Sequence, residues 1–234
     1  EGIYQSAHEI LEGWDYNMEA SSSAALIYEI LWIELNRSMF HDELGDDLYP
    51  LMLGNNIIPR NLINRIRITG ESGWCDDITT GNKKESFHDN IRSAFFNTVD
   101  TLTTMYGTDI STWQWGDLHK VALMHPLGSV SILDKLFKIN SGSYPVGGSF
   151  HTVCPYSYPI GRSFISDHGA SERHIFNPAD WDASLTVIPT GTSGVPASPH
   201  YLDQTELYVG NQFHRDHFSR ESVETNMKYK AVFE

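Results

Sequence analysis

Cysteine is scarce in this chain of 234 residues, which contains only Cys75 and Cys154. The two lie too far apart for a C-x-x-C pair, so a zinc or redox site built on that motif is excluded. Two alternatives stay open for them: a disulfide between the two sulfurs, or two separate buried thiols. The G-x-S-x-G turn that carries the nucleophile of α/β-hydrolases is absent as well.

Basic charge and long apolar runs are also lacking. The chain has 16 Lys and Arg residues against 30 Asp and Glu residues, a formal net charge of −14. This balance argues against nucleic acid and an anionic membrane surface, because both bind clustered cations. No apolar run approaches the roughly 20 residues of a membrane span, and residues 1–4 resemble no part of a signal peptide. We therefore expect no nucleic-acid partner, no signal peptide and no membrane span in this chain.

Apolar residues are nevertheless plentiful, at 40% of the chain, which is enough to bury the core of one large domain or two small ones. Serines at positions 21–23 offer N-caps for a helix over residues 24–40, and Gly45 offers its end. Most positions of this helix are apolar, so we expect it to be buried against other elements. Its polar surface is expected at Glu29, Glu34 and Asn36.

The remaining pattern changes along the chain. Further helices are expected over residues 59–68 and 84–106, separated by a loop and followed by Gly107 as a stop. From residue 113 onward, Pro, Gly, Ser and Thr recur every few residues. Short strands are expected over residues 150–155 and 185–189, a turn over 142–148, and a terminal helix then strand over 218–234. The prediction is an α+β fold, mainly helical over 1–112 and strand-rich over 113–234.

Several motifs stand in one order along the chain. The most distinctive is the stretch 189–204, a turn rich in Pro, Gly, Ser and Thr that presents Ser-Pro-His-Tyr at 198–201 and Asp-Gln at 203–204. The others are residues 11–15 with 22–28, 113–119 with 125–128, 145–148 with 152–153, 169–173 and 218–221. Together they resemble the C-terminal portion of the catalytic subunit of the penicillin acylase family, a family of N-terminal-nucleophile (Ntn) hydrolases.

The resemblance implies an αββα sandwich and an autocatalytically processed enzyme. In that family a new N-terminal Ser, with its own α-amino group as base, attacks a linear amide such as a penicillin side chain or an acyl-homoserine lactone. Such enzymes are exported to the periplasm or secreted. The partners implied here are a small amide substrate, the small subunit and the N-terminal part of the catalytic subunit.

The sequence departs from the family pattern at the nucleophile. Glu1 has neither hydroxyl nor thiol, and no Ser-Asn pair occurs. Gly-Ser pairs at 128–129, 142–143 and 148–149 lack the expected sequel. The family's oxyanion Asn and calcium ligands lie upstream of the matched region, so we expect no cofactor and no metal in this chain. We expect the C-terminal part of an amidohydrolase that is inactive alone. The alternatives are a non-catalytic binding or structural module, and a hydrolase that uses an internal Ser.

Five residues are candidates for a site. Gly148 and His151 are pocket candidates because small residues at 147–148 let a ligand approach closely. His200 and Tyr201 are either at the pocket rim or in a corner that locks a loop onto the sheet. Asn177 stands where some cephalosporin acylase relatives have a supporting carboxylate, and it is either a weak catalytic support or a turn residue before Pro178. His119 and His125 are expected to be packed in or beside a strand, without a metal.

Overall fold

The computed structural model describes residues 2–54, 57–166 and 168–233. They form two compact units, each assembled from two separate stretches of chain. The first consists of residues 1–121 and 145–168, and the second of residues 122–144 and 169–234. These units differ from the sequential segments 1–112 and 113–234, because the chain leaves the first unit after residue 121 and returns to it at residue 145.

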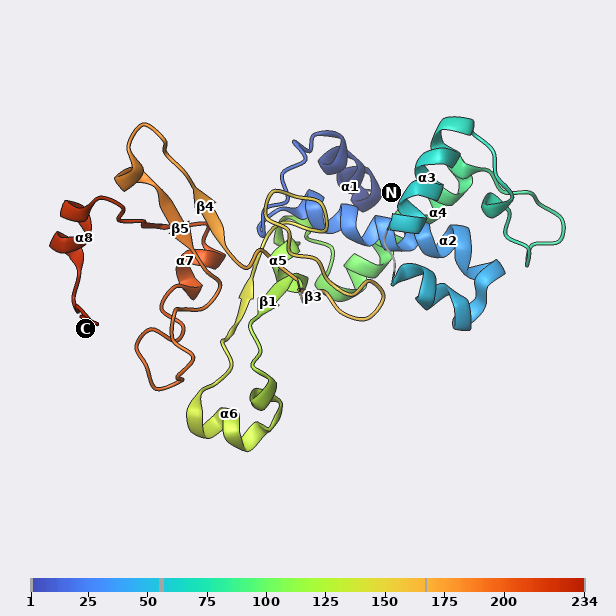
Figure 1. Ribbon diagram of the computed structural model, residues 1–234. Coiled ribbons are helices and arrows are strands. Elements are labelled where there is room, and N and C mark those ends of the chain that lie inside the picture. The colour runs from blue at the N-terminus through green and yellow to red at the C-terminus, as the bar shows by residue number, and fades with distance from the viewer. Residues whose placement is uncertain (1, 55–56, 167, 234) are drawn as a thin grey trace. The chain divides into compact units, whose positions relative to one another are not determined.

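The fold is α+β, as the sequence predicts (Figure 1). The α-helices are α1 (Gly2–Glu12), α2 (Ser23–Leu53), α3 (Ile57–Thr69), α4 (Phe87–Tyr106), α5 (Trp115–Leu118), α6 (Ser131–Phe137), α7 (Thr205–Val209) and α8 (Arg220–Asn226). The short 3-10 helices are η1 (Gly73–Cys75), η2 (Ile110–Thr112), η3 (Pro126–Ser129) and η4 (Trp181–Ala183). The strands are β1 (Lys120–Ala122), β2 (Ser143–Pro145), β3 (Ile165–Ser166), β4 (Arg173–Ile175), β5 (Leu185–Val187) and β6 (His214–Arg215). None of the helices in the described residues is both long and apolar enough to cross a membrane.

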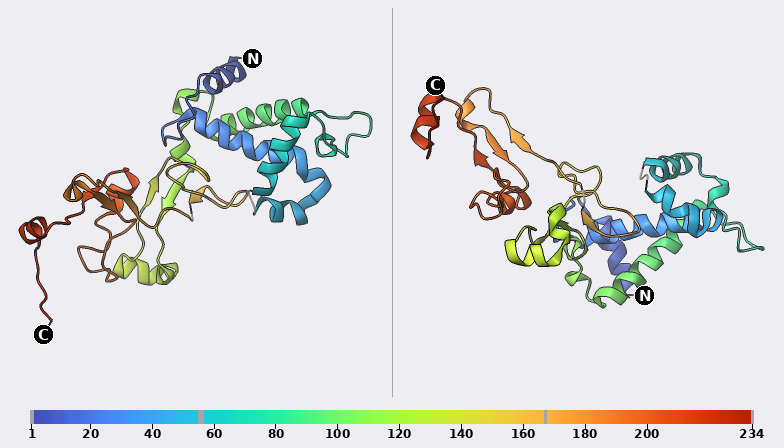
Figure 2. Two further views of the ribbon diagram at one scale, coloured as in Figure 1. Left: turned by 45° about the horizontal axis from the view of Figure 1, so that its top comes forward. Right: turned by 60° about the horizontal axis from the view of Figure 1, so that its bottom comes forward.

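Helix α2 organises the first unit. Ser22 caps it by accepting a hydrogen bond from the Ala25 amide, as the run of serines predicts. Gly45 interrupts the helix with φ +62° and ψ −176°, but the chain resumes helical geometry and continues to Leu53. The predicted stop at Gly45 is therefore a kink within a longer helical segment. Helix α4 packs along α2 (Figure 2).

Two predicted helices keep their expected positions. Helix α4 begins with a complete capping box, in which Ser86 and Asp89 each bond the other's backbone amide. Gly107, at φ +84°, ends it, in a backbone region that side-chain-bearing residues rarely adopt. Helix α3 covers the range expected for the second helix. One face of α4 turns inward, where Val99 and Leu102 are completely buried.

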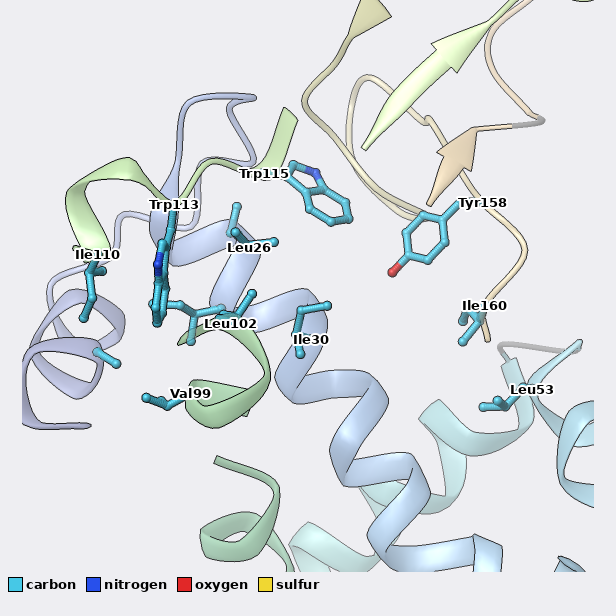
Figure 3. Close-up of a cluster of buried hydrophobic side chains, with 13 residues drawn as sticks. Leu26, Ile30, Leu53, Val99, Leu102, Ile110, Trp113, Trp115, Tyr158 and Ile160 are labelled. Carbon is cyan, nitrogen blue, oxygen red and sulfur yellow. The ribbon is translucent and has the colours of Figure 1, made fainter. Parts of the chain in front are cut away.

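Two tryptophan side chains lie in the core of the first unit. Trp113 and Trp115 are fully buried among α2, α4 and the loop that follows β2 (Figure 3). The indole nitrogen of Trp113 donates to the Gly107 carbonyl, and that of Trp115 donates to the Gly148 carbonyl at 2.9 Å. Each indole thus buries its ring and satisfies its only donor. His119 stacks on Trp115, with ring centroids 4.4 Å apart.

The strands are short. In the first unit β1 and β3 run parallel, with Lys120 opposite Ile165 and Val121 opposite Ser166. In the second unit β4, β5 and β6 form an antiparallel sheet in that order. Strand β5 pairs Thr186 with His174 on one side and with His214 on the other.

Three local predictions are wrong. Residues 150–155 form a turn instead of a strand, because the Thr152 hydroxyl bonds to the Ser149 amide and to the Cys154 carbonyl and closes the chain on itself. Residues 142–148 contain β2 and are not turn throughout. The terminal helix forms as α8, but residues 227–233 after it form no strand.

Candidate functional site

A cleft of about 660 Å³ opens in the first unit beside the beginning of α2. Its walls come from the loop after α1, from α2 and α3, and from the turn after Gly148. The lining is aromatic with a few polar groups that converge on it: Trp14, Tyr16, Tyr28, Trp32 and Phe150, with Glu29, Arg60, Asn64, Ser149, His151 and Thr152. A volume and a lining of this kind are typical of a site for a small, partly apolar ligand.

A buried carboxyl group lies at this cleft. Glu29 is only 3% exposed, although it was expected to be on the polar surface of its helix. One of its oxygens accepts a hydrogen bond of 2.6 Å from the hydroxyl of Tyr158, which is 2% exposed, and Ser149 provides a second side-chain hydrogen bond. Helix α2 presents Glu29 inward because its neighbours Leu26, Ile27 and Ile30 form the same buried face.

Burial governs the acid–base properties of this pair. It raises the pKa of Glu29, because an ionised carboxyl loses its water, while the bonds from Ser149 and Tyr158 partly offset the rise. Burial also raises the pKa of Tyr158, and the nearby Glu29 adds to that rise. The carboxyl group is thus engaged by two hydroxyls. This geometry fixes the turn after Gly148 to α2 and leaves Glu29 poorly placed to remove a proton from a ligand.

Gly148 and His151 both belong to this region. Gly148 has φ +76°, and a Cβ added to it would stand 2.1 Å from the Cys154 carbonyl oxygen, so only glycine fits. His151 lines the cleft together with Arg60. Its pKa is lowered, first by partial burial and then by the positive charge of Arg60. A neutral imidazole can donate and accept one hydrogen bond each, which suits it to orienting a ligand.

The mouth of the cleft is an aromatic cluster. Trp14 lies 5.3 Å from Tyr28 and 5.5 Å from Tyr16, measured between ring centroids. The indole nitrogen of Trp14 donates to the Asn17 carbonyl, which holds the ring in place. Such rings favour an apolar or aromatic group in the cleft.

His200 and Tyr201 lie in the second unit, on the loop of the 189–204 motif. His200 contacts Asp203 at 2.8 Å, and the Tyr201 hydroxyl donates to the Ile139 carbonyl at 2.7 Å. A Cβ on Gly191 would stand 2.2 Å from the His200 carbonyl oxygen, so the loop closes tightly on itself. These contacts fit the interpretation of a locked corner, and the rim role of His200 and Tyr201 stays a prediction.

Asn177 also has local partners in the second unit. Its side-chain oxygen accepts from the Ala179 amide, and its backbone amide donates to the Ser184 hydroxyl. It follows the end of β4 and begins a turn. This environment fits the interpretation of Asn177 as a turn residue.

The two histidines weighed as metal ligands have backbone partners. His125 is exposed at the start of η3, where its ring nitrogen accepts from the Leu127 amide, so the expectation that it packs in or beside a strand is wrong. His119 is completely buried, with its ring nitrogens 3.1 Å from the Val146 carbonyl oxygen and 2.8 Å from that of Tyr156. Burial lowers the pKa of His119, and both hydrogen bonds oppose that shift. Over the described ranges, no group of three His, Cys, Asp or Glu side chains is arranged to hold a metal ion. Asp42 and Asp89 line a second, polar hollow of about 780 Å³, but both already accept backbone hydrogen bonds.

Sequence reasoning missed Glu29 and Tyr158 as partners. They are 129 positions apart, and no spacing rule joins them. One signal for Glu29 was present: a carboxylate within the apolar run 24–31 is costly to bury unless it finds hydrogen-bond donors.

Comparison with known proteins places this chain in context. A family model described as penicillin amidase matches residues 3–225. An acyl-homoserine lactone acylase QuiP from Pseudomonas syringae pv. syringae is 27% identical over 214 residues, covering 87% of this chain and 25% of that protein. The QuiP of Pseudomonas aeruginosa is 27% identical over 227 residues, covering 89% and 26%. The chain therefore spans about a quarter of the length of these relatives.

Two further matches are to proteins named as penicillin acylases. Penicillin acylase 2 proenzyme from Pseudomonas sp. (strain SE83) is 37% identical over 90 residues, which is 38% of this chain and 12% of that protein. Among solved structures, a thermostable penicillin G acylase from Alcaligenes faecalis matches with a TM-score of 0.50 at 13% identity, covering 99% of this chain and 42% of that one. The likeness in structure concerns the fold alone. Because the family model matches nearly the whole chain, this chain belongs to the penicillin amidase family.

Proposed function

We propose that this chain is the C-terminal part of an amidohydrolase that cleaves a linear amide, either a β-lactam side chain or an acyl-homoserine lactone. The observation that carries this proposal is the match of the penicillin amidase model to residues 3–225, with relatives named as acylases of both kinds. The chain spans 25% and 26% of two of these relatives, so a protein of their size has ample sequence for a nucleophile outside these residues.

The proposed reaction uses an N-terminal Ser exposed by autoproteolysis. Its hydroxyl oxygen attacks the amide carbonyl, the amine leaves with a proton, and water then hydrolyses the acyl-enzyme to the acid. Within the present residues, the cleft beside Glu29 is proposed as one wall of the acyl pocket. Its aromatic lining would contact the apolar acyl group, and His151 would contact its polar end. The partners are the small subunit and the N-terminal part of the catalytic subunit, and the location is the periplasm or the exterior.

The test is hydrolysis by the protein expressed from its complete reading frame. We expect release of equal amounts of amine and acid from a chromogenic phenylacetyl amide or from an N-acyl-homoserine lactone, and no release by the 234-residue chain alone. A folded complete protein that hydrolyses neither substrate would favour a non-catalytic module. Turnover by the 234-residue chain alone would overturn the proposed external nucleophile.

The role of the cleft has its own test. In the complete protein, His151→Ala is expected to raise KM several-fold with kcat nearly unchanged, because it removes a binding contact and no reacting group. The control is His88→Ala, which changes an exposed histidine on α4 outside this cleft. If both substitutions changed KM equally, the cleft would not be part of the acyl pocket.

A further inference from the structure

The second unit has an exposed apolar surface. It belongs to the arm formed by η3 and α6, residues 123–141. Leu136 is 68% exposed and Ile132 66% exposed, and no residue of α6 is buried. The exposed large apolar side chains of the arm are Met124, Leu127, Val130, Ile132, Leu136 and Phe137.

The helix of this arm has two distinct sides. At 100° per residue, the apolar side chains at 132, 133, 136 and 137 fall on one side of α6, and the charged residues Asp134 and Lys135 fall on the other. An amphipathic helix in a folded protein normally buries its apolar side. Contiguous apolar surface of this kind marks an interaction site more often than a free surface.

Polar contacts fix the shape of the arm, independently of its apolar side chains. The Asn140 side chain accepts from the His125 amide at 3.0 Å and donates to the Gly128 carbonyl at 3.1 Å. A Cβ on Gly128 would stand 2.0 Å from the Asn140 side-chain oxygen, so a larger residue there would displace the Asn140 side chain from its two hydrogen bonds. The Asn140 amide in turn donates to Asp134 on α6.

The base of the arm is tied as well. The Ser141 amide donates to the Leu123 carbonyl, and the Leu123 amide donates to the Ser141 hydroxyl. The Tyr201 hydroxyl bonds the Ile139 carbonyl, which links the arm to the loop of the 189–204 motif. Free helices of two turns are unstable in water, so these bonds hold α6 in a preformed shape. A preformed apolar element loses little entropy when it docks.

We propose that the apolar side of the α6 arm docks into an apolar groove on the part of the same protein that lies outside these 234 residues. The proposal rests on the proposed function, since it takes the chain to be one part of a longer acylase. The relatives are about four times longer than the matched region, and 58% of the Alcaligenes faecalis penicillin G acylase chain lies outside the match (100 − 42). The net charge of −14 and the two signs of charge on the polar side of α6 disfavour an anionic membrane as the occupant.

Photo-cross-linking in the complete protein tests what covers the apolar side of α6. Benzoylphenylalanine at position 136 is expected to cross-link to a peptide from outside these 234 residues, and the same group at position 135 is expected to give little product. Lys135 is the matched control because it is the adjacent residue on the polar side of the same helix. Cross-links from position 136 to a peptide within the 234 residues, to a second copy of the protein, or to added anionic lipid vesicles would each overturn the proposal.

Thiol labelling provides a second, quantitative measurement. In the complete native protein, Leu136→Cys is expected to react with a maleimide about tenfold more slowly than Lys135→Cys, because a docked side chain reacts only after local opening. Peptide mass spectrometry separates these sites from Cys75 and Cys154, and both rates should become equal in denaturant. Equal rates in the native protein would overturn the proposal.

Neither cross-linking nor thiol labelling depends on catalysis. The docking proposal and the proposed function can therefore be refuted independently. An inactive complete protein with protected Leu136→Cys contradicts the proposed function and supports docking. An active protein with unprotected Leu136→Cys contradicts docking and leaves the proposed function standing.

Discussion

The hydrogen bond between Tyr158 and Glu29 gives the sharpest test of how the first unit is held together. Tyr158→Phe removes one hydroxyl and leaves the ring, whose contacts with Phe150 and Phe164 at centroid distances of 4.8 and 5.2 Å are unchanged. Both partners are almost fully buried, so water cannot replace the lost donor. We expect the substitution to lower the free energy of unfolding by about 2 kcal/mol, within the range for a bond to a buried charged or polar group.

The size of this loss should depend on pH. Burial raises the pKa of Glu29 above its ordinary value of 4.5, so below that pH the group is neutral in both folded and unfolded states. Stability associated with the neutral acid is therefore present below pH 4.5 and is lost as pH rises through the folded-state pKa. The Tyr158 bond is stronger to a carboxylate than to a carboxylic acid. The deficit of Tyr158→Phe should thus grow from about 1 kcal/mol at low pH to about 2–3 kcal/mol once Glu29 is ionised.

Urea unfolding followed by tryptophan fluorescence, between pH 4 and pH 9, measures both quantities. Tyr28→Phe is the matched control, because Tyr28 lines the same cleft but is 43% exposed, and its loss should stay within about 0.5 kcal/mol. Glu29→Gln should remove the pH dependence that Glu29 contributes. A Tyr158→Phe variant as stable as the control at every pH would refute the reasoning.

Two further predictions concern one residue in each unit. Gly148→Ala should lower the free energy of unfolding by more than about 2 kcal/mol, because φ is +76° and the new Cβ would meet the Cys154 carbonyl oxygen, whereas Gly81→Ala should change it by less than about 0.5 kcal/mol in urea unfolding. Asp182 has its pKa lowered to about 2 by hydrogen bonds from the side chain and amide of Ser219 and from a neighbouring amide. Its stabilising effect is present above the ordinary pKa of 3.8 and is lost as pH falls through about 2, so Asp182→Ala should be less stable than the parent at pH 6, and this difference should be smaller at pH 2. Hydrogen exchange over residues 214–226 would show this, and an unchanged difference at both pH values would contradict it.

Local chemistry made much of the helical part predictable. The Ser22 cap, the capping box of α4 and the Gly107 stop are decided by residues within one turn of each other. The same reasoning failed at residues 150–155, where apolar and β-branched residues suggested a strand. There the Thr152 hydroxyl competes successfully with sheet pairing, and a pattern of hydrophobicity contains no information on that competition.

The candidate site was likewise predicted only in part from the sequence. Small residues at 147–148 pointed to Gly148 and His151, and both lie beside or in the cleft. The acid at that cleft was not predicted, since Glu29 was assigned to the surface of its helix. Its burial depends on the hydroxyls of Tyr158 and Ser149, which are more than 100 positions away.

The sequence by itself therefore determined the family and the places of helices α2, α3 and α4, because motifs and caps are short-range features. The tertiary structure alone decided that Glu29 is buried and paired with Tyr158, and that one side of α6 is left in contact with water. These depend on which distant segments meet, and burial free energy acts only between segments that the fold has already brought together.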